Sequence, residues 1–270
     1  MLKIKDYVKA ESLGQAYELN QKKANRIIGG MLWMKMSDAQ IQTVIDLSGL
    51  GLDQIEETDE EFSIGCMTTL RQLELHEGLN TYTNGAVRES VRHIVGVQFR
   101  NLATVGGSIF GRYGFSDVLT CFMGLDAYVE LYKGGIVPLE TFAGMQKDND
   151  ILVRVIVKKT AQKYVYLSHR NTKTDFPVIA CMVSLQGNSG KVVIGARPAK
   201  AMALHLSEEQ MQILNSADVC ETCVKKIADE IAADVPTESN IRASAQYRSH
   251  LIRVLVRRAI MQLVKEGGCE

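Results

Sequence analysis

Three short turns rich in small residues are the strongest candidates for a ligand site in this 270-residue sequence. They are Gly29-Gly30, Gly65-Cys-Met-Thr-Thr69 and Thr104-Val-Gly-Gly-Ser108, and each follows or interrupts an apolar, strand-like run. Glycine lets backbone N–H groups turn towards a ligand without obstruction by a Cβ atom, and successive N–H groups form nests that suit phosphate oxygens. Serine and threonine hydroxyls add donors, so together the turns would suit a pyrophosphate. Taken singly, each double glycine is also the ordinary mark of a tight turn.

The common nucleotide and hydrolase motifs are missing from the sequence. There is no GxGxxG between a strand and a helix, no Walker pattern, no HExxH and no GxSxG. A dinucleotide would therefore bind through a different fold. The five histidines are scattered without zinc-ligand spacing, and we interpret them as surface or capping residues: His76, His93, His169, His205 and His250.

The cysteines predict a reduced, intracellular protein. Cys66, Cys121 and Cys181 lie in apolar surroundings, as buried free thiols do. Cys220 and Cys223 form a single CxxC, which without a second pair is a weak metal or redox signal. We interpret this pair as part of an amphipathic helix.

Composition excludes several partner classes. The formal net charge is zero, so bulk electrostatics favours neither nucleic acid nor an anionic membrane. No apolar run approaches the roughly 20 residues that span a bilayer, and the N-terminus lacks a signal-peptide core, so we expect a cytoplasmic protein. The C-terminal arginines are interpreted as a solvated helix face or as inter-subunit salt bridges: Arg242, Arg248, Arg253, Arg257 and Arg258.

Hydrophobic periodicity predicts irregularly alternating strands and helices up to about residue 166. We expect helices from Ser12 to about residue 22, over 70–75 with Thr68 or Thr69 as N-cap, over 86–95, and from Ser116 or Asp117 through Leu125. The expected strands are 26–28, 43–47, 61–65, 126–132, 151–157 and 164–166. Gly106-Gly107 is expected to form a turn.

Beyond about residue 170 the pattern changes to strands first and helices last. A hairpin is expected from strands 178–185 and 191–196, joined by a turn at 187–190. Helices follow near 207–214, 219–232 and 240–265. The sequence therefore predicts two α+β domains in one chain.

The run Arg100-Asn-Leu-Ala-Thr-Val-Gly-Gly-Ser108 is followed by Phe115-Ser-Asp117 before an apolar helix. This arrangement resembles a signature of the FAD subunits of molybdenum hydroxylases, such as xanthine dehydrogenase, nicotinate dehydrogenase and aerobic carbon monoxide dehydrogenase. Ile28-Gly29-Gly30 resembles their first FAD loop, and Ile64-Gly-Cys-Met-Thr-Thr-Leu-Arg71 the second. Gly195-Ala-Arg-Pro198 and the run from Tyr247 to Ala259 resemble parts of their C-terminal domain.

The resemblance implies a vanillyl-alcohol-oxidase (PCMH) type FAD-binding domain of two subdomains over residues 1–166. A smaller α+β flavoprotein C-terminal domain would occupy 167–270. The implied cofactor is FAD. Molybdopterin would reside on a large partner subunit and two [2Fe-2S] clusters on a small one.

The resemblance also implies a set of FAD contacts. Gly29 and Gly30 would face the pyrophosphate, and Thr104 with its glycines would form the second side of the cradle. Asp117 would hold ribityl or ribose hydroxyls, and Tyr166 would lie near the isoalloxazine. The full set is Ile28, Gly29, Gly30, Met31, Leu32, Thr68, Thr104, Gly106, Gly107, Ser108, Asp117, Ile151, Leu152 and Tyr166.

Two positions depart from the family pattern. Met31 and Leu32 replace the usual Thr-Asp or His-Ser of the first loop, which removes side-chain donors. Ser168 stands where a lysine is expected near the flavin, and Lys173 or Arg170 could substitute for it.

The implied function is electron transfer from [2Fe-2S] clusters through FAD to NAD or another acceptor, in a complex that hydroxylates a heterocycle such as a purine. No catalytic residue and no metal ligand are expected on this chain. Two alternatives stay open: a structural subunit with a degenerate flavin site, motivated by Met31 and Leu32, and a free-standing flavin reductase.

Overall fold

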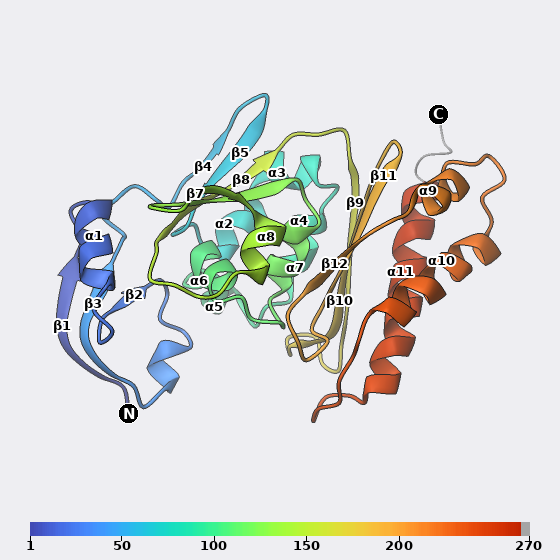
Figure 1. The fold of residues 1–270 in the computed structure, drawn as a ribbon. Helices are drawn as coiled ribbons and strands as arrows, with labels where there is room; N and C mark the ends of the chain where they lie inside the picture. The colour runs from blue at the N-terminus through green and yellow to red at the C-terminus, as the bar shows by residue number, and fades with distance from the viewer. Residues whose placement is uncertain (266–270) are drawn as a thin grey trace. The chain divides into compact units, whose positions relative to one another are not determined.

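The computed structural model describes residues 1–265 and divides into two compact units, each assembled from three stretches of chain (Figure 1). The first unit comprises residues 1–73, 95–111 and 127–159, and the second comprises 74–94, 112–126 and the chain from residue 160 onward. Both units contain helices and sheets, which confirms the predicted α+β class.

A small parallel sheet in the first unit supports the first glycine loop. Its strand order is β1 (Lys3–Lys9), β3 (Gln40–Asp46), β2 (Arg26–Ile28). Helix α1 (Leu13–Asn20) precedes β2, and Ser12 caps it by accepting a hydrogen bond from the Gln15 N–H. The periodicity predicted α1, β2 and β3 but not β1, because β1 has no buried residue and therefore no alternating apolar face.

A second sheet in the first unit is antiparallel, with order β4-β5-β8-β6-β7. Its buried central strand, β8, begins immediately after the predicted contact Ile151. The bounds are β4 Ile55–Glu57, β5 Glu61–Gly65, β6 Ala127–Leu131, β7 Gly135–Pro138 and β8 Leu152–Lys158. The accompanying helical segments are η1 Met34–Met36, α2 Leu70–Leu75, α5 Val97–Arg100, α6 Val105–Phe110 and α8 Leu139–Gly144.

The prediction of a turn at Gly106-Gly107 is wrong, because both glycines lie in helix α6. Thr104 is the N-cap, and its side chain accepts the Gly107 N–H. Val105 and Ile109, four residues apart, are both fully buried on one helix face. The buried pair and the threonine cap together outweigh the low helix propensity of two glycines.

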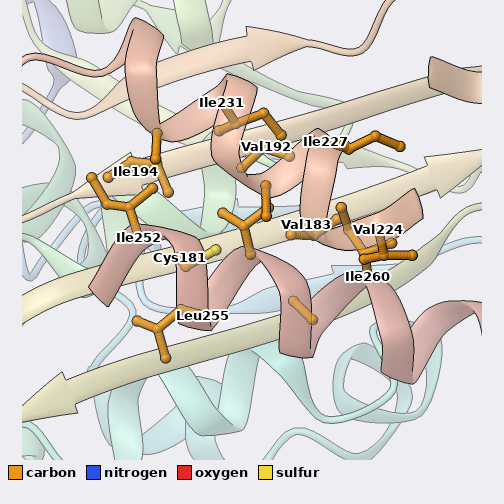
Figure 2. Close-up of a cluster of buried hydrophobic side chains, with 14 of the residues drawn as sticks. Cys181, Val183, Val192, Ile194, Val224, Ile227, Ile231, Ile252, Leu255 and Ile260 are labelled. Carbon is orange, nitrogen blue, oxygen red and sulfur yellow. The ribbon is translucent and has the colours of Figure 1, made fainter. Parts of the chain in front are cut away.

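The second unit contains an antiparallel sheet of order β12-β11-β10-β9, covered on one face by two long helices. Figure 2 shows Cys181, Val183, Val192 and Ile194 of the sheet packed against Val224 and Ile260 of the helices. The bounds are β9 Lys163–Arg170, β10 Pro177–Gln186, β11 Ser189–Gly195, β12 Met202–His205, α9 Glu208–Leu214, α10 Glu221–Asp234 and α11 Ala245–Lys265.

Helices α4 (Ala86–Arg92) and α7 (Asp117–Met123) contact the same sheet, and α3 (Glu77–Tyr82) precedes α4. A Cβ atom on Gly124, which ends α7, would lie 2.3 Å from Cγ of Met182. Met182 alternates along β10 with Cys181 and Val183, so α7 covers the face opposite α10 and α11.

Arg248 does not lie on a solvated helix face as predicted, because it is 1% exposed. Its guanidinium donates to the carbonyls of Val178, Glu238 and Ala243 and to Oδ1 of Asn240. The other arginines of α11 include Arg253, which pairs with Asp229 of α10 at 3.2 Å. Among residues 1–265, no helix is long and apolar enough to cross a membrane.

Candidate functional site

The three small-residue loops predicted from the sequence lie together in the first unit. A Cβ atom on Gly30 would lie 1.9 Å from the carbonyl oxygen of Leu102, and one on Gly29 would lie 2.5 Å from Oγ1 of Thr104. Real Cβ contacts are never this short, so glycine at these positions lets the first loop pack against the chain that leads into α6.

The second loop packs against the third through backbone hydrogen bonds. The Val105 and Gly106 N–H groups donate to the carbonyls of Thr68 and Cys66, each at 2.8 Å. Leu70 N–H donates to the Ala103 carbonyl at 2.8 Å. A Cβ atom on Gly106 would lie 2.7 Å from the Cys66 carbonyl oxygen, so this glycine also serves a close backbone approach.

Hydrogen bonds within the protein determine which loop still has backbone N–H groups to donate to a ligand. Gly106 N–H is bonded to Cys66, Gly107 N–H to Oγ1 of Thr104, and Ser108 N–H to the Thr104 carbonyl. These three N–H groups of the third loop are therefore already bonded within the protein. The second loop is similarly engaged, since Cys66 N–H donates to Val153 and Met67 N–H to Leu52.

The first loop is different. Within the part of the chain that the structure describes, the N–H groups of Gly29, Gly30, Met31 and Leu32 have no hydrogen-bond partner. Met31 adopts a left-handed conformation with φ of 58°, and its side chain packs against the buried cluster of Ile28, Ile41 and Val44. A left-handed residue within a run of unbonded N–H groups is the arrangement that forms an anion-binding nest.

Three other predicted residues of the first unit are buried. Thr68 is fully buried, and its hydroxyl donates to the Gln54 carbonyl at 3.1 Å. Ile151 and Leu152 are 1% and 4% exposed. They lie at the start of β8, beside the second loop, because the next residue, Val153, accepts the Cys66 N–H.

Thr69 caps α2, as one of the two predicted N-cap residues, but its partner Gln72 was missed in the sequence. Oγ1 of Thr69 accepts the Gln72 N–H at 3.2 Å, and Oε1 of Gln72 accepts the Thr69 N–H at 2.8 Å. The Gln72 amide also donates to the Asp53 carbonyl. Thr-x-x-Gln is a capping box, so the signal was present in the sequence.

The remaining predicted residues, Asp117 and Tyr166, contact each other in the second unit. Asp117 opens α7, where Ser116 is the N-cap. Its Oδ1 accepts the Tyr166 hydroxyl at 2.5 Å and the Nη2 of Arg170 at 2.6 Å. All three side chains are at least nine-tenths buried, so the cluster is a shielded charge pair with a phenol attached.

Burial dominates the protonation of this cluster. Burial raises the pKa of Asp117, and the Arg170 charge and the Tyr166 hydrogen bond oppose that shift. Burial, followed by the Asp117 charge, raises the pKa of Tyr166 well above its usual range, so the phenol stays protonated and donates. Of the two residues suggested as substitutes for the missing lysine, Arg170 joins the cluster, whereas Lys173 is exposed.

Comparison with known protein families identifies the family of the chain that carries these loops. Residues 2–159 match the model of the FAD binding domain in molybdopterin dehydrogenase. The chain belongs to this family. Residues 164–263 match the CO dehydrogenase flavoprotein C-terminal domain. The chain is therefore an FAD-binding subunit of the molybdenum-hydroxylase type, as its sequence motifs predicted.

Known proteins resemble this flavoprotein subunit in sequence and in fold over nearly its whole length. It is 23% identical to the xanthine dehydrogenase FAD-binding subunit of Escherichia coli O157:H7, with 99% of each chain covered. Its fold matches that of quinoline 2-oxidoreductase from Pseudomonas putida 86 with a TM-score of 0.83 at 17% identity, covering 98% of each chain. The structure of reconstituted CO dehydrogenase from Oligotropha carboxidovorans gives 0.82 at 22% identity, covering 96% of this chain and 97% of that one.

The residues present in this flavoprotein subunit suit the diphosphate of FAD. Consecutive backbone N–H groups without protein partners are neutral donors that an anionic diphosphate can accept from. Although Met31 and Leu32 supply no side-chain donors, the loop therefore still has backbone N–H donors.

Proposed function

We propose that this chain is the FAD-carrying electron-transfer subunit of a multi-subunit molybdenum hydroxylase of the xanthine dehydrogenase type. The observation that carries the proposal is the run of unbonded N–H groups at residues 29–32, in a chain whose residues 2–159 match an FAD-binding domain. When bound, FAD accepts and releases two electrons. In our proposal these electrons arrive from [2Fe-2S] clusters on a small partner subunit and leave to NAD or another acceptor.

The first loop binds the diphosphate in this proposal. Gly29, Gly30, Met31 and Leu32 donate their N–H groups, and the Met31 side chain anchors the loop by packing into the apolar cluster beneath it. Gly106, Gly107 and Ser108 act mainly by position, because their N–H groups stabilise the protein itself, and Thr104 acts as the N-cap of α6. Thr68, Ile151 and Leu152 form the buried support of the second loop.

Asp117, Tyr166 and Arg170 form the polar centre of the second unit. We propose that Asp117 holds a hydroxyl of the cofactor's sugar chain through an oxygen lone pair that Tyr166 and Arg170 leave available. Tyr166 and Arg170 fix the carboxylate orientation and supply its compensating charge. Arg170 then takes the place of the lysine that the family pattern has two residues earlier.

Partner subunits complete the proposed enzyme. A large subunit would carry the molybdenum cofactor and hydroxylate a heterocycle, and we propose a purine as its substrate. Support comes from the xanthine dehydrogenase relative, which covers 99% of this chain. Co-purification of the tagged chain from its native host, followed by metal analysis for molybdenum and iron, tests the assembly. Xanthine, an aldehyde and carbon monoxide, each with NAD or ferricyanide, then separate substrate and acceptor classes.

Titration of the purified full-length chain with FAD tests the cofactor site. We expect flavin fluorescence to be quenched and the melting temperature to rise, because a ligand at about 100 times its Kd adds about 2.7 kcal/mol to the free energy of unfolding. Amide hydrogen exchange at residues 29–32 should slow on binding. A chain that stays colourless with excess FAD and keeps fast exchange at these amides contradicts the proposal.

A structural subunit with a degenerate flavin site is the second candidate, and Met31 and Leu32 are the observation that favours it. The variant Leu32→Ser separates the two, because it restores a side-chain donor of the family pattern and leaves the Met31 anchor in place. If backbone donors suffice, FAD affinity changes by less than about tenfold. Under the second candidate, the variant binds FAD whereas the native chain does not.

A further inference from the structure

Two cysteines at the start of α10 stand outside the flavin site and differ from the other described thiols. Cys220 is the N-cap of this 14-residue helix, and its Sγ accepts the Cys223 N–H at 3.3 Å. The two sulfur atoms lie 2.7 Å apart. Cys220 is exposed and Cys223 is half-buried. One turn of helix therefore presents a thiol pair to solvent with the two sulfurs in contact.

The remaining described cysteines, Cys66, Cys121 and Cys181, are buried in the core. Burial raises the pKa of each of these thiols to about 12, so they are poor nucleophiles at neutral pH. The pKa of Cys220 is instead lowered, first by the hydrogen bond from Cys223 and then by backbone N–H groups at the helix start. Within residues 1–265, thiolate reactivity is thus concentrated at Cys220.

Basic side chains of α11 line a groove beside this pair. The groove has a volume of about 510 Å³, and Glu221, the residue after Cys220, contributes to its wall. Arg257 pairs with Glu221 at 3.5 Å, while Arg258 and Lys265 also line the groove and are exposed. The charge of the groove is therefore positive, and it suits a small molecule that carries carboxylates.

We propose that Cys220 and Cys223 form a thiol–disulfide exchange site for low-molecular-weight disulfides that carry carboxylates. The thiolate of Cys220 attacks one sulfur of the small disulfide, whose S–S bond breaks and releases the first small thiolate. The thiolate of Cys223 then attacks Sγ of the mixed disulfide at Cys220. A Cys220–Cys223 bond forms, the second small thiolate leaves, and two small thiols are produced after protonation. The protein is oxidised by two electrons, and the small disulfide is reduced by two.

Mass spectrometry of the full-length chain after incubation with oxidised glutathione tests this exchange. The background is Cys269→Ser, because Cys269 is the sixth cysteine of the sequence. We expect the loss of two hydrogens and a Cys220–Cys223 peptide link. Cys223→Ser should stop at a glutathione adduct on Cys220, and Cys220→Ser should react at least about tenfold more slowly. Serine is itself a favoured N-cap, so α10 should still form in Cys220→Ser.

A charge comparison tests the substrate class. Arg258→Glu should slow the reaction with oxidised glutathione several-fold at low salt and leave the reaction with neutral hydroxyethyl disulfide unchanged. Equal rates for Cys220 in the folded chain and in urea would overturn the exchange site. An equal effect of Arg258→Glu on both disulfides would overturn the assignment to carboxylate-bearing disulfides. Neither readout requires bound FAD, so a failure of the proposed flavin site is distinguishable.

Discussion

At the scale of single residues, Gly30 is the position where the site tolerates least change. Its missing Cβ is what allows the first loop to approach the Leu102 carbonyl. We expect Gly30→Ala to lower the free energy of unfolding by about 2 kcal/mol, because the backbone of one loop must shift. FAD affinity should fall with it. Urea unfolding and an FAD titration measure both effects.

Gly144→Ala is the matched control for this substitution. A Cβ atom there meets nothing within 4 Å, and the residue lies at the end of α8. Its effect should stay within about 0.5 kcal/mol. Equal stability losses for Gly30→Ala and Gly144→Ala would show that the close approach of the loops is not what Gly30 provides.

Asp117 makes a prediction about pH. Burial raises the pKa of its carboxyl above the ordinary 3.8, so the folded chain binds this proton more tightly than the unfolded chain does. The stabilisation from protonation is complete below 3.8 and is lost as pH rises through the higher folded pKa. Measured by urea unfolding, the stability of the native chain relative to Asp117→Asn should therefore decline as pH rises across this window.

The control is Asp218→Asn, which alters an exposed side chain and should give no such trend. A relative stability that instead grows with pH would mean that Arg170 and Tyr166 outweigh burial at Asp117.

At the scale of elements, Arg248 joins α11 to the segment before it and to β10. Arg248→Met would remove one donor from each of three carbonyls and from the Asn240 amide oxygen. We expect a loss of about 3 kcal/mol and a melting temperature lower by about 10 °C. Arg253→Met on the same helix removes one half-exposed ion pair and should cost less than about 1 kcal/mol. Calorimetry measures the melting temperatures of both variants. Equal values would refute the role of Arg248 in joining α11 to its neighbours.

The sequence predicted elements well where one face alternates and poorly where tertiary contacts decide. Strand β5 and helix α11 carry clear periodic patterns, and both were expected near their observed bounds. Helix α6 was missed because Gly106 and Gly107 are turn residues by propensity, whereas the burial of Val105 and Ile109 is a tertiary effect. Arg248 was misread because a guanidinium is buried only when distant carbonyls satisfy it.

The candidate site could also be predicted only in part from the sequence. The resemblance singled out the three loops that the structure brings together. Which loop keeps unbonded N–H groups could not be predicted, because it depends on backbone partners such as Cys66 and Thr68 that are distant in sequence. Residue types identify a glycine loop, but only packing decides whether its donors are already used.

At the scale of the whole molecule, the second unit is assembled from three separate stretches of chain. We therefore expect that its C-terminal stretch cannot fold by itself. Helices α4 and α7 contact the sheet β9–β12 but come from residues before 127. A fragment of residues 160–270 would expose the apolar sheet face that includes Met182. We expect it to bind the dye ANS and aggregate, whereas the native chain should do neither. A monomeric, cooperatively folding fragment would contradict this expectation.

The nest at residues 29–32 has a consequence for how this protein can evolve. Recognition through main-chain amides does not depend on which side chains the loop carries, provided that the backbone keeps its path. Gly30 is held by a steric requirement and Met31 by its packing against the apolar cluster, whereas the side chain of Leu32 is free to vary. Selection on such a loop preserves its backbone path more than its side chains. Divergent members of the family can therefore lose the usual residues of the first loop and still bind the ligand.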